Sequence, residues 1–174
     1  MGKVQAGHRR LRGRTTPIDA RTTARTRKVM QRMAKLNVKL FRATNGRLGS
    51  RWRVGRGFLR GVPMCLLTTT GRRSGAERVA PLVYLRDGED VVVVASQGGL
   101  PRHPDWFFNV TANPSVRIEL PGTAFDATAR VADAQERARL WPMLVEMYPS
   151  FEVYQARAVR EIPVVICTPV GAGG

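Results

Sequence analysis

The chain has 174 residues, of which 43% are apolar and 24% are charged, and its formal net charge is +16. This length fits one domain that buries about two-thirds of its unfolded surface. The sequence has no uncharged apolar run of about 18 residues and no apolar stretch of the signal-peptide kind at its start. We therefore expect neither a membrane span nor export, and we expect a cytoplasmic protein.

The positive charge is concentrated at one end of the sequence. Residues 1–60 hold 18 Lys and Arg against the single acid Asp19, which gives them a charge of +17. Residues 61–174 hold 11 Lys and Arg against 12 acids, which leaves them at −1. We expect residues 1–45 to form a basic arm and residues 46–174 to form the folded, coenzyme-binding domain.

The arm itself has two parts. Residues 1–23 are rich in Arg, Gly and Thr and bury too little apolar surface to fold in isolation, so they are predicted to be disordered. Apolar side chains then recur at helical spacing, at Val29, Met33, Leu36 and Leu40. A basic stripe accompanies them, which predicts an amphipathic helix that ends at Asn45-Gly46.

Three interpretations of the arm remain open. The helix covers an end or a face of the folded domain, or it lies on an anionic membrane surface, and the two are not exclusive. Nucleic-acid binding by the arginine-rich tail is a third interpretation, because phosphate contacts need no fold. No aromatic stacking surface or recognition motif accompanies the tail, so we expect no specific nucleic-acid partner.

After a linker or short lid over residues 46–61, the pattern is one of short strands joined by hairpins. Alternating or continuous apolar runs predict strands at residues 63–70, 78–85, 90–97, 115–120, 123–131 and 162–168. A short helix is expected to begin at Pro104 and to end before Asn113-Pro114. A capping box at residues 133–136 predicts a second helix to about Tyr148, in which Pro142 is a candidate kink. Because the hairpins make neighbouring strands antiparallel, we predict a mainly β (α+β) fold built on a small, partly closed barrel.

The turn between the first two strands is the most distinctive short motif. It reads Gly71-Arg72-Arg73-Ser74-Gly75, and Arg78 follows at the start of the next strand. Main-chain N–H groups and guanidinium groups that converge in such a turn can bind a phosphate-like anion. The alternative is an ordinary hairpin connection with solvated arginines.

The cysteine, histidine and serine side chains do not indicate a metal site or a catalytic nucleophile. Cys65 and Cys167 lie isolated in apolar runs, which predicts buried, unpaired thiols. The only histidines are His8 and His103, so we expect no metal site. No serine has a histidine at local spacing, and catalysis through a bound cofactor therefore fits the sequence better.

Several motifs that occur in order between residues 61 and 169 resemble one known family. They read TTTGRRSG from Thr68, RVAPLVYLRDG from Arg78, VASQGG from Val94, HPDWFFNVTANP from His103 and WPMLVEMYPSF from Trp141. The chain resembles the deazaflavin-dependent nitroreductase family, which includes quinone reductases that use the reduced deazaflavin coenzyme F420. The resemblance implies a split β-barrel of the flavin-reductase or FMN-binding kind, preceded here by the N-terminal amphipathic helix.

The same resemblance implies where the coenzyme binds. The family positions that receive its anionic phosphodiester and polyglutamate tail match Arg72, Arg73, Ser74 and Arg78. The positions that form an apolar slot for its flat ring match Val79, Ala80, Pro81, Leu82, Val83, Val94, Ala95, Ser96, Gln97, Asp105, Trp106, Phe107, Phe108 and Asn109. Trp106 is either a flat wall of this slot or a buried core anchor.

The candidates for the reacting face are Ser96, Tyr148, Phe151 and Tyr154. In the family, an aromatic segment that corresponds to residues 148–154 closes over the substrate and the deazaflavin. The nitroreductase pattern has tyrosine where this chain has Phe151, and the loss of that hydroxyl removes a proton donor. We expect this difference to weaken nitro reduction more than quinone reduction, whose proton can come from water. The Ser96 hydroxyl either polarises the acceptor or is satisfied locally.

We predict an oxidoreductase that moves a hydride from reduced coenzyme F420 to a quinone-like acceptor such as a menaquinone, or to a nitro-aromatic one. The alternatives are an FMN-dependent oxidoreductase of the same barrel fold and a non-catalytic protein that binds coenzyme or membrane. The basic arm makes peripheral attachment to the inner face of the cell membrane a further expectation. The sequence leaves the oligomeric state open.

Overall fold

The structure of the chain is a computed structural model that describes residues 36–48, 50–52 and 61–171. The segment predicted to be disordered, and Val29 and Met33 of the predicted helix, lie outside the described residues. Residues 36–43 are helical. The domain boundary placed at residue 45 stays a prediction.

After the helix at residues 36–43, the described residues form seven strands, three further helices and one short turn of 3-10 helix. The strands are β1 (Arg51–Trp52), β2 (Val62–Thr70), β3 (Glu77–Asp87), β4 (Asp90–Val94), β5 (Ser115–Leu120), β6 (Thr123–Val131) and β7 (Val164–Pro169). The helices are α2 (Asp105–Ala112), α3 (Ala134–Met147) and α4 (Ser150–Arg157), and the short turn is η2 (Gln97–Gly99).

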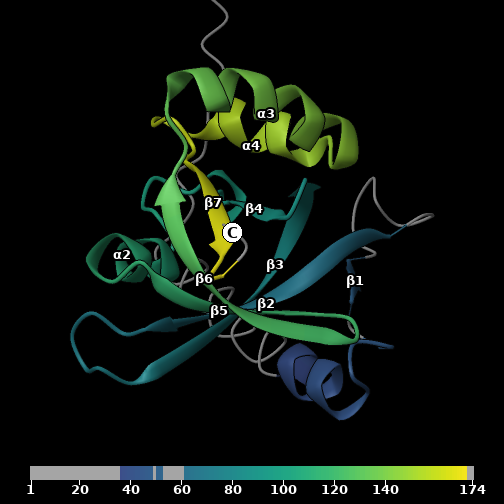
Figure 1. Cartoon of the computed structure of the whole chain (residues 1–174). Coiled ribbons are helices and arrows are strands. Elements are labelled where there is room, and N and C mark those ends of the chain that lie inside the picture. The colour runs from purple at the N-terminus through teal and green to yellow at the C-terminus, as the bar shows by residue number, and fades with distance from the viewer. Residues whose placement is uncertain (1–35, 49, 53–60, 172–174) are drawn as a thin grey trace, which may run out of the picture. The chain divides into compact units, whose positions relative to one another are not determined.

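Strands β2 to β7 close into an antiparallel barrel (Figure 1). They pair in the order β2-β3-β4-β7-β6-β5, and β5 pairs back onto β2, so that Leu67 of β2 faces Ala80 on one side and Ile118 on the other. Gly88 and Gly122 adopt φ angles of +60° and +79° in the β3–β4 and β5–β6 hairpins, where glycine avoids the strain of a left-handed residue. The predicted antiparallel barrel is confirmed.

The barrel interior is a packed apolar core. Side chains alternate between the two faces of a strand, and every second residue therefore points inward. The buried interior cluster includes Cys65, Leu67, Val91, Val93, Ile118, Val165 and Cys167. Burying a Val, Leu or Ile side chain contributes about 1.5–3 kcal/mol, so this cluster is a main source of stability.

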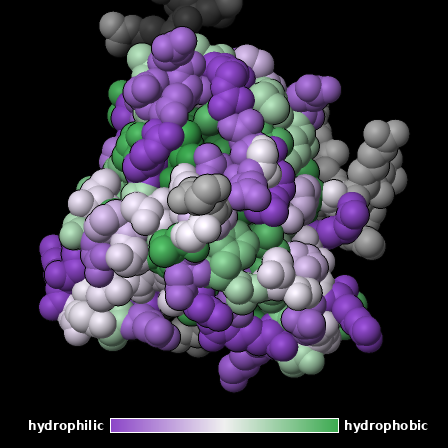
Figure 2. Space-filling model, in the orientation of Figure 1, coloured by the Kyte–Doolittle hydropathy of each residue, from purple (hydrophilic) through white to green (hydrophobic). Residues whose placement is uncertain are grey.

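A second apolar cluster lies on the outer face of β4 and β7. Val92, Val94, Val164 and Ile166 pack there with Leu140 and Leu144 of α3 and with Phe151 of α4. Figure 1 shows α3 and α4 side by side above these strands, and Figure 2 shows mostly hydrophilic residues over their outward side. Because β4 is buried on both faces, its sequence is an unbroken valine run instead of an alternating one.

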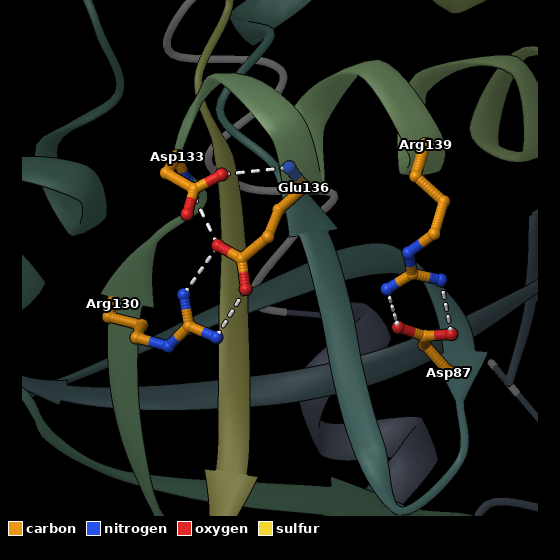
Figure 3. A network of polar contacts seen from close by, with 5 residues as sticks. All are labelled: Asp87, Arg130, Asp133, Glu136 and Arg139. Atoms are coloured by element: carbon orange, nitrogen blue, oxygen red, sulfur yellow. Dashed lines mark hydrogen bonds and ion pairs between the residues drawn. The ribbon is translucent and has the colours of Figure 1, made fainter.

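The capping box predicted for α3 is present. The Asp133 side chain accepts from the Glu136 N–H at 2.8 Å, and the Glu136 carboxylate accepts from the Asp133 N–H at 3.0 Å (Figure 3). The helix runs on through Pro142 to Met147. The box satisfies two N–H groups that the first turn of a helix otherwise leaves without partners.

The described end of the N-terminal helix stops where the sequence predicts. The Gly46 N–H donates to Phe41 O at 2.8 Å and the Asn45 N–H to Arg42 O at 3.3 Å, which is a Schellman arrangement with Asn45 and Gly46 left-handed. A Cβ on Gly46 would lie 2.5 Å from the Pro121 Cα, so only glycine fits against the β5–β6 turn.

The same helix contacts the barrel through a face other than the predicted apolar stripe. Phe41 is 3% exposed, and Arg42 forms an ion pair with Glu119 of β5. By contrast, Leu36 and Leu40 are 67% and 41% exposed. Among the described residues, no helix combines the length and the apolar character needed to cross a membrane.

Three elements differ from the sequence-based prediction. Strand β4 ends at Val94 instead of residue 97, because Gln97 and the glycines after it take left-handed angles that a strand cannot contain. Residues 150–157 form α4, for which no element was predicted, because Phe151 is its one buried residue and its sequence has no apolar stripe at helical spacing. Strand β1 is a two-residue pairing within the stretch predicted to be a linker.

Candidate functional site

The β2–β3 turn presents its basic side chains to solvent. Its main chain is closed by bonds from the Gly71 N–H to Ala76 O and from the Gly75 N–H to Gly71 O, both 2.8 Å. Arg72, Arg73 and Ser74 are exposed. The fold therefore keeps this turn rigid through its main chain and leaves the guanidinium groups available.

A buried asparagine ties the turn to α2. Asn109 is 5% exposed, and its Oδ1 accepts from the Arg72 N–H at 3.2 Å while its Nδ2 donates to Thr69 Oγ1 at 3.1 Å. Thr69 Oγ1 in turn donates to Arg78 O at 3.3 Å. The structure thus gives Asn109, predicted from the resemblance to line the coenzyme slot, a clear positioning contact with the basic turn.

Two arginines lie over the ring of Phe108, which α2 presents beside the turn. The guanidinium carbons of Arg72 and Arg102 lie 4.8 Å and 5.5 Å from its centroid, within the range of cation–π attraction. Arg78 donates to Ser74 Oγ at 3.4 Å. Arg72, Ser74 and Arg78 are therefore joined in one positively charged cluster, and Arg73 is exposed on the same turn.

Arg102 belongs to this cluster but was missed in the sequence analysis. It also pairs with Asp105 at 3.0 Å, across the first turn of α2. Its position directly before the HPDWFF motif was the only available signal. Its approach to Phe108 depends on the path of the loop between β4 and α2.

That loop, residues 95–103, carries Ser96 and Gln97 next to the cluster. Gln97, Gly98 and Gly99 have φ angles of +47°, +67° and +80°. When its amide nitrogen faces the acceptors, Gln97 donates to the main-chain oxygens of His103 and Arg102 at 3.0 Å and 3.2 Å. A Cβ on Gly99 would lie 2.7 Å from Tyr154 O, so α4 and the loop are in close contact.

His103 and its aromatic neighbours form the wall that α2 adds to the site. The His103 ring lies 4.7 Å from the ring of Phe107 and 5.8 Å from that of Phe108. Its Nδ1 is buried and finds no hydrogen-bond partner in the described part of the chain. Burial, and then the charge of Arg160, lower the pKa of His103, which favours a neutral imidazole.

The predicted slot residues of β3 and β4 divide between two faces. Ala80 and Leu82 pack against the barrel interior, whereas Val83 packs against the outer cluster. In the same way Ala95 belongs to the interior and Val94 to the outer cluster. Since side chains alternate along a strand, the segments 79–83 and 94–95 can offer only part of their side chains to any one ligand.

Trp106 is 8% exposed and belongs to the interior cluster, edge-on to Phe107 at 6.3 Å. The structure therefore gives it the role of a core anchor, and the role of a flat wall stays a prediction.

The three aromatic candidates for the reacting face lie together between α3, α4 and the outer face of the sheet. Tyr148 and Phe151 are 5% and 4% exposed, and their rings meet edge-to-face at 5.1 Å. The hydroxyls of Tyr148 and Tyr154 lie 3.3 Å apart. Burial, together with this hydrogen bond, raises the pKa of Tyr154 to about 12. The structure brings these residues together with one another, and α4 meets the 95–103 loop through the Tyr154 main chain.

The two thiols are not available as nucleophiles. Cys65 and Cys167 are free and fully buried in the barrel interior, as predicted. Burial raises the pKa of both, that of Cys167 to about 12. In the part of the chain that the structure describes, no three His, Cys, Asp or Glu side chains gather as a metal site.

Comparisons with known proteins address the function of this arrangement. The family model of the F420H(2)-dependent quinone reductases matches residues 32–169. An F420H(2)-dependent quinone reductase of Mycobacterium tuberculosis is 38% identical over 146 residues, which cover 82% of this chain and 93% of that protein. A second relative from the same organism, named for the same activity, is 42% identical over 117 residues, or 67% of this chain and 98% of its own.

Two solved structures extend the comparison to the fold. An F420-H2 dependent reductase is 42% identical with a TM-score of 0.57, covering 60% of this chain and 93% of that one. A domain-swapped dimer is 35% identical with a TM-score of 0.59, covering 83% of this chain and 98% of that one. These structures confirm the predicted split barrel.

The comparisons also bear on the functional alternatives. A family of reductases sets the non-catalytic alternative aside, and the FMN alternative receives no support from the family or from these relatives. The predicted resemblance is confirmed over most of the described barrel. The chain belongs to the F420H(2)-dependent quinone reductase family and is an oxidoreductase that depends on reduced coenzyme F420.

Proposed function

We propose that this protein transfers a hydride from reduced coenzyme F420 to an apolar quinone such as a menaquinone. The observation that carries the proposal is the link between the exposed arginines of the β2–β3 turn and α2. Through Asn109, an anion-binding turn and an aromatic wall are held in one fixed arrangement. A ligand with an anionic tail and a flat apolar ring matches that arrangement.

The residues present fit both requirements of the coenzyme. Its phosphodiester and polyglutamate tail are anionic, and within the described residues no carboxylate forms an ion pair with Arg72, Arg73 or Arg78. Its ring needs an apolar neighbour, and Phe107 and Phe108 are half-buried beside the same turn. The coenzyme, when bound, supplies the hydride, and the protein supplies binding, orientation and hydrogen bonds.

The chain's own groups then act on the tail and on the acceptor. Arg72, Arg73 and Arg78 bind the anionic tail through charge-assisted hydrogen bonds. The Ser96 hydroxyl, in the loop that follows β4, donates to an acceptor oxygen. Reduction of a quinone to a quinol needs one hydride and one proton, and we assign the proton to water.

The aromatic segment favours quinones over nitro compounds. Phe151 has no hydroxyl, and its ring is buried in the outer cluster. The nearby Tyr154 has its pKa raised to about 12, which makes its hydroxyl a poorer proton donor than that of an ordinary tyrosine. We propose nitro-aromatic compounds as weak alternative acceptors for this reason.

Two measurements test the proposal. Oxidation of reduced coenzyme F420 is followed with menaquinone, with a nitroaromatic compound and without acceptor, and we expect the fastest oxidation with menaquinone. Fluorescence titrations with coenzyme F420 and with FMN are run in parallel. Tight binding of FMN without binding of the deazaflavin, or no acceleration by menaquinone, would overturn the proposal.

We further propose that the N-terminal segment attaches the protein to the inner face of the cell membrane. The support is an apolar surface next to a strongly basic sequence. Leu36, Leu40 and Leu48 are 67%, 41% and 55% exposed, and Thr44 connects the latter two by accepting from the Leu48 N–H at 2.9 Å and donating to Leu40 O at 2.7 Å. Residues 1–60 carry a charge of +17. Basic segments with an apolar face bind anionic lipid.

Vesicle sedimentation tests this attachment. We expect the full chain to sediment with vesicles that contain anionic lipid, and to do so less as salt rises, because screening lengths fall from about 10 Å at 0.1 M to about 3 Å at 1 M. Replacement of Leu36, Leu40 and Leu48 by Gln should release the protein, whereas Val159→Gln, at a position 87% exposed, should not. Equal sedimentation of all variants would contradict the proposal.

A further inference from the structure

One arginine joins both ends of the 95–103 loop to the segment that precedes β7. Nη2 of Arg160 lies 3.2 Å from Ala95 O, 3.3 Å from Ser96 O and 3.4 Å from Arg102 O. Ala95 follows directly on β4, and Arg102 precedes α2. A single guanidinium group therefore bridges the entry and the exit of the loop.

Arg160 is itself held in place by α3 and α4. Gln155 Nε2 donates to Arg160 O at 3.0 Å. Gln155 Oε1 accepts from the Ile162 N–H at 2.9 Å and from Arg137 Nη2 at 3.1 Å. These bonds fix the main chain at Arg160 and directly after it, and the three carbonyls bound by its Nη2 hold the guanidinium group itself.

The loop needs such a support. Three consecutive residues, Gln97 to Gly99, adopt left-handed angles, and Gln97 has a side chain that disfavours this conformation. Some main-chain oxygens of the loop bond within the loop, and three accept from Arg160, which lies outside it. Arg160 Nε is buried and has no hydrogen-bond partner among the described residues, so burial of this side chain is compensated chiefly through the carbonyls that it binds.

We propose that Arg160 is a positioning residue that fixes the 95–103 loop, and with it Ser96, Gln97 and the approach of Arg102 to Phe108. This proposal rests on the proposed function only for the identity of the ligand, coenzyme F420. The placement of the loop can be measured without any ligand. Arg160 acts through the loop and has no assigned contact with coenzyme or acceptor.

The test compares Arg160→Met and Arg160→Lys with the matched control Arg86→Met. Arg86 is an exposed arginine whose side chain binds Glu89 O in the β3–β4 hairpin. We expect both Arg160 variants, and not the control, to speed hydrogen exchange of the Gly99 and Leu100 amides, which bond within the loop. If the loop keeps its native conformation only a tenth of the time, the coenzyme dissociation constant rises about tenfold.

Two readouts separate a positioning role from a general loss of stability. Arg160→Met should raise the pKa of His103 toward its ordinary value, whereas Arg160→Lys, which keeps the charge, should raise it less. A third variant, Arg160→Ala, leaves space for a free guanidinium ion. Guanidinium chloride at low concentration should restore the coenzyme affinity of this variant, while sodium chloride at equal ionic strength should not.

The outcomes are distinguishable. Unchanged loop exchange in Arg160→Lys and Arg160→Met would overturn the proposal whether or not coenzyme binds. If the wild-type protein binds no coenzyme but the Arg160 variants show faster loop exchange than it does, the positioning role is supported and the proposed function is refuted. Should Arg160→Met fail to fold, Arg160→Lys decides the matter: loop exchange faster than in wild type would support the proposal, and exchange equal to wild type would overturn it.

Discussion

The arginines on the two sides of this barrel have opposite surroundings. Those around the first turns of α3 are matched by carboxylates, because Arg130 of β6 pairs with Glu136 and Arg139 of α3 with Asp87, both at 2.6 Å (Figure 3). Those of the β2–β3 turn, Arg72 and Arg73, form no ion pair with a carboxylate of the described residues. Their turn is instead secured through main-chain bonds and Asn109.

The difference separates two uses of the same side chain. An arginine paired within the protein has its charge compensated in the folded state and contributes to the packing of α3 against the sheet. An arginine held by its main chain, with an uncompensated guanidinium group, is available to an anionic ligand. The comparison predicts that changes at the turn alter binding and that changes at α3 alter stability.

The largest effect is expected at the turn. Replacing Arg72, Arg73 or Arg78 singly by Ala should weaken coenzyme binding by about 1.5–3 kcal/mol, the range for hydrogen bonds to charged groups, or about ten- to a hundredfold. The loss should shrink as salt rises. Fluorescence titration measures it, and Arg139→Ala is the matched control. Unchanged dissociation constants in all three variants would mean that the turn is an ordinary hairpin connection with solvated arginines.

The second effect concerns the residue that joins the turn to α2. Asn109→Ala leaves the Arg72 N–H without its acceptor and removes the bond that the Thr69 hydroxyl accepts, and a buried polar group left unpaired costs about 1–3 kcal/mol in the free energy of unfolding. Urea unfolding measures this loss, and coenzyme affinity should fall as well. Asn109→Asp keeps the acceptor for Arg72 and should lose less. Equal unfolding free energies for Asn109→Ala and wild type would show that Asn109 does not hold the β2–β3 turn against α2.

At α3 a smaller effect on stability is expected, without an effect on binding. Asp133→Ala removes the N-cap acceptor and should cost about 1 kcal/mol of unfolding free energy. Asp133→Asn retains an acceptor oxygen and serves as the control. Coenzyme affinity should stay at the wild-type value in both variants. A drop in affinity comparable to that of the turn variants would break the separation drawn between the two regions.

The smallest effect is a pH dependence. Bonds from Arg130 and from the Asp133 N–H lower the pKa of Glu136 to about 2, from an ordinary value of 4.5. The unfolded chain therefore takes up a proton at a higher pH than the folded chain does. The stabilisation is fully present above pH 4.5 and is lost as the pH falls toward 2. Thermal midpoints across this range should fall less steeply for Glu136→Gln, and parallel curves would exclude Glu136 as a contributor.

Local sequence determined much of the fold. The strands at residues 115–120 and 123–131, the turn at Gly122, the capping box at Asp133 and the helix stop at Asn45-Gly46 all follow from signals within a few residues of each other. The basic turn and the motifs around it were likewise visible, and they were sufficient to identify the family. Local signals work here because caps, turns and alternation depend on neighbouring residues.

The tertiary structure alone decided how these pieces meet. Asn109 and Thr69 are 40 residues apart, and Arg160 and Ala95 are 65 apart, so no local pattern could pair them. The sequence does not show that Phe151 is buried in the outer cluster, or that residues 79–83 divide between two faces, because both depend on where α4 and the barrel wall lie. Residue spacing specifies the elements, and the closure of the barrel brings side chains distant in sequence within hydrogen-bonding reach.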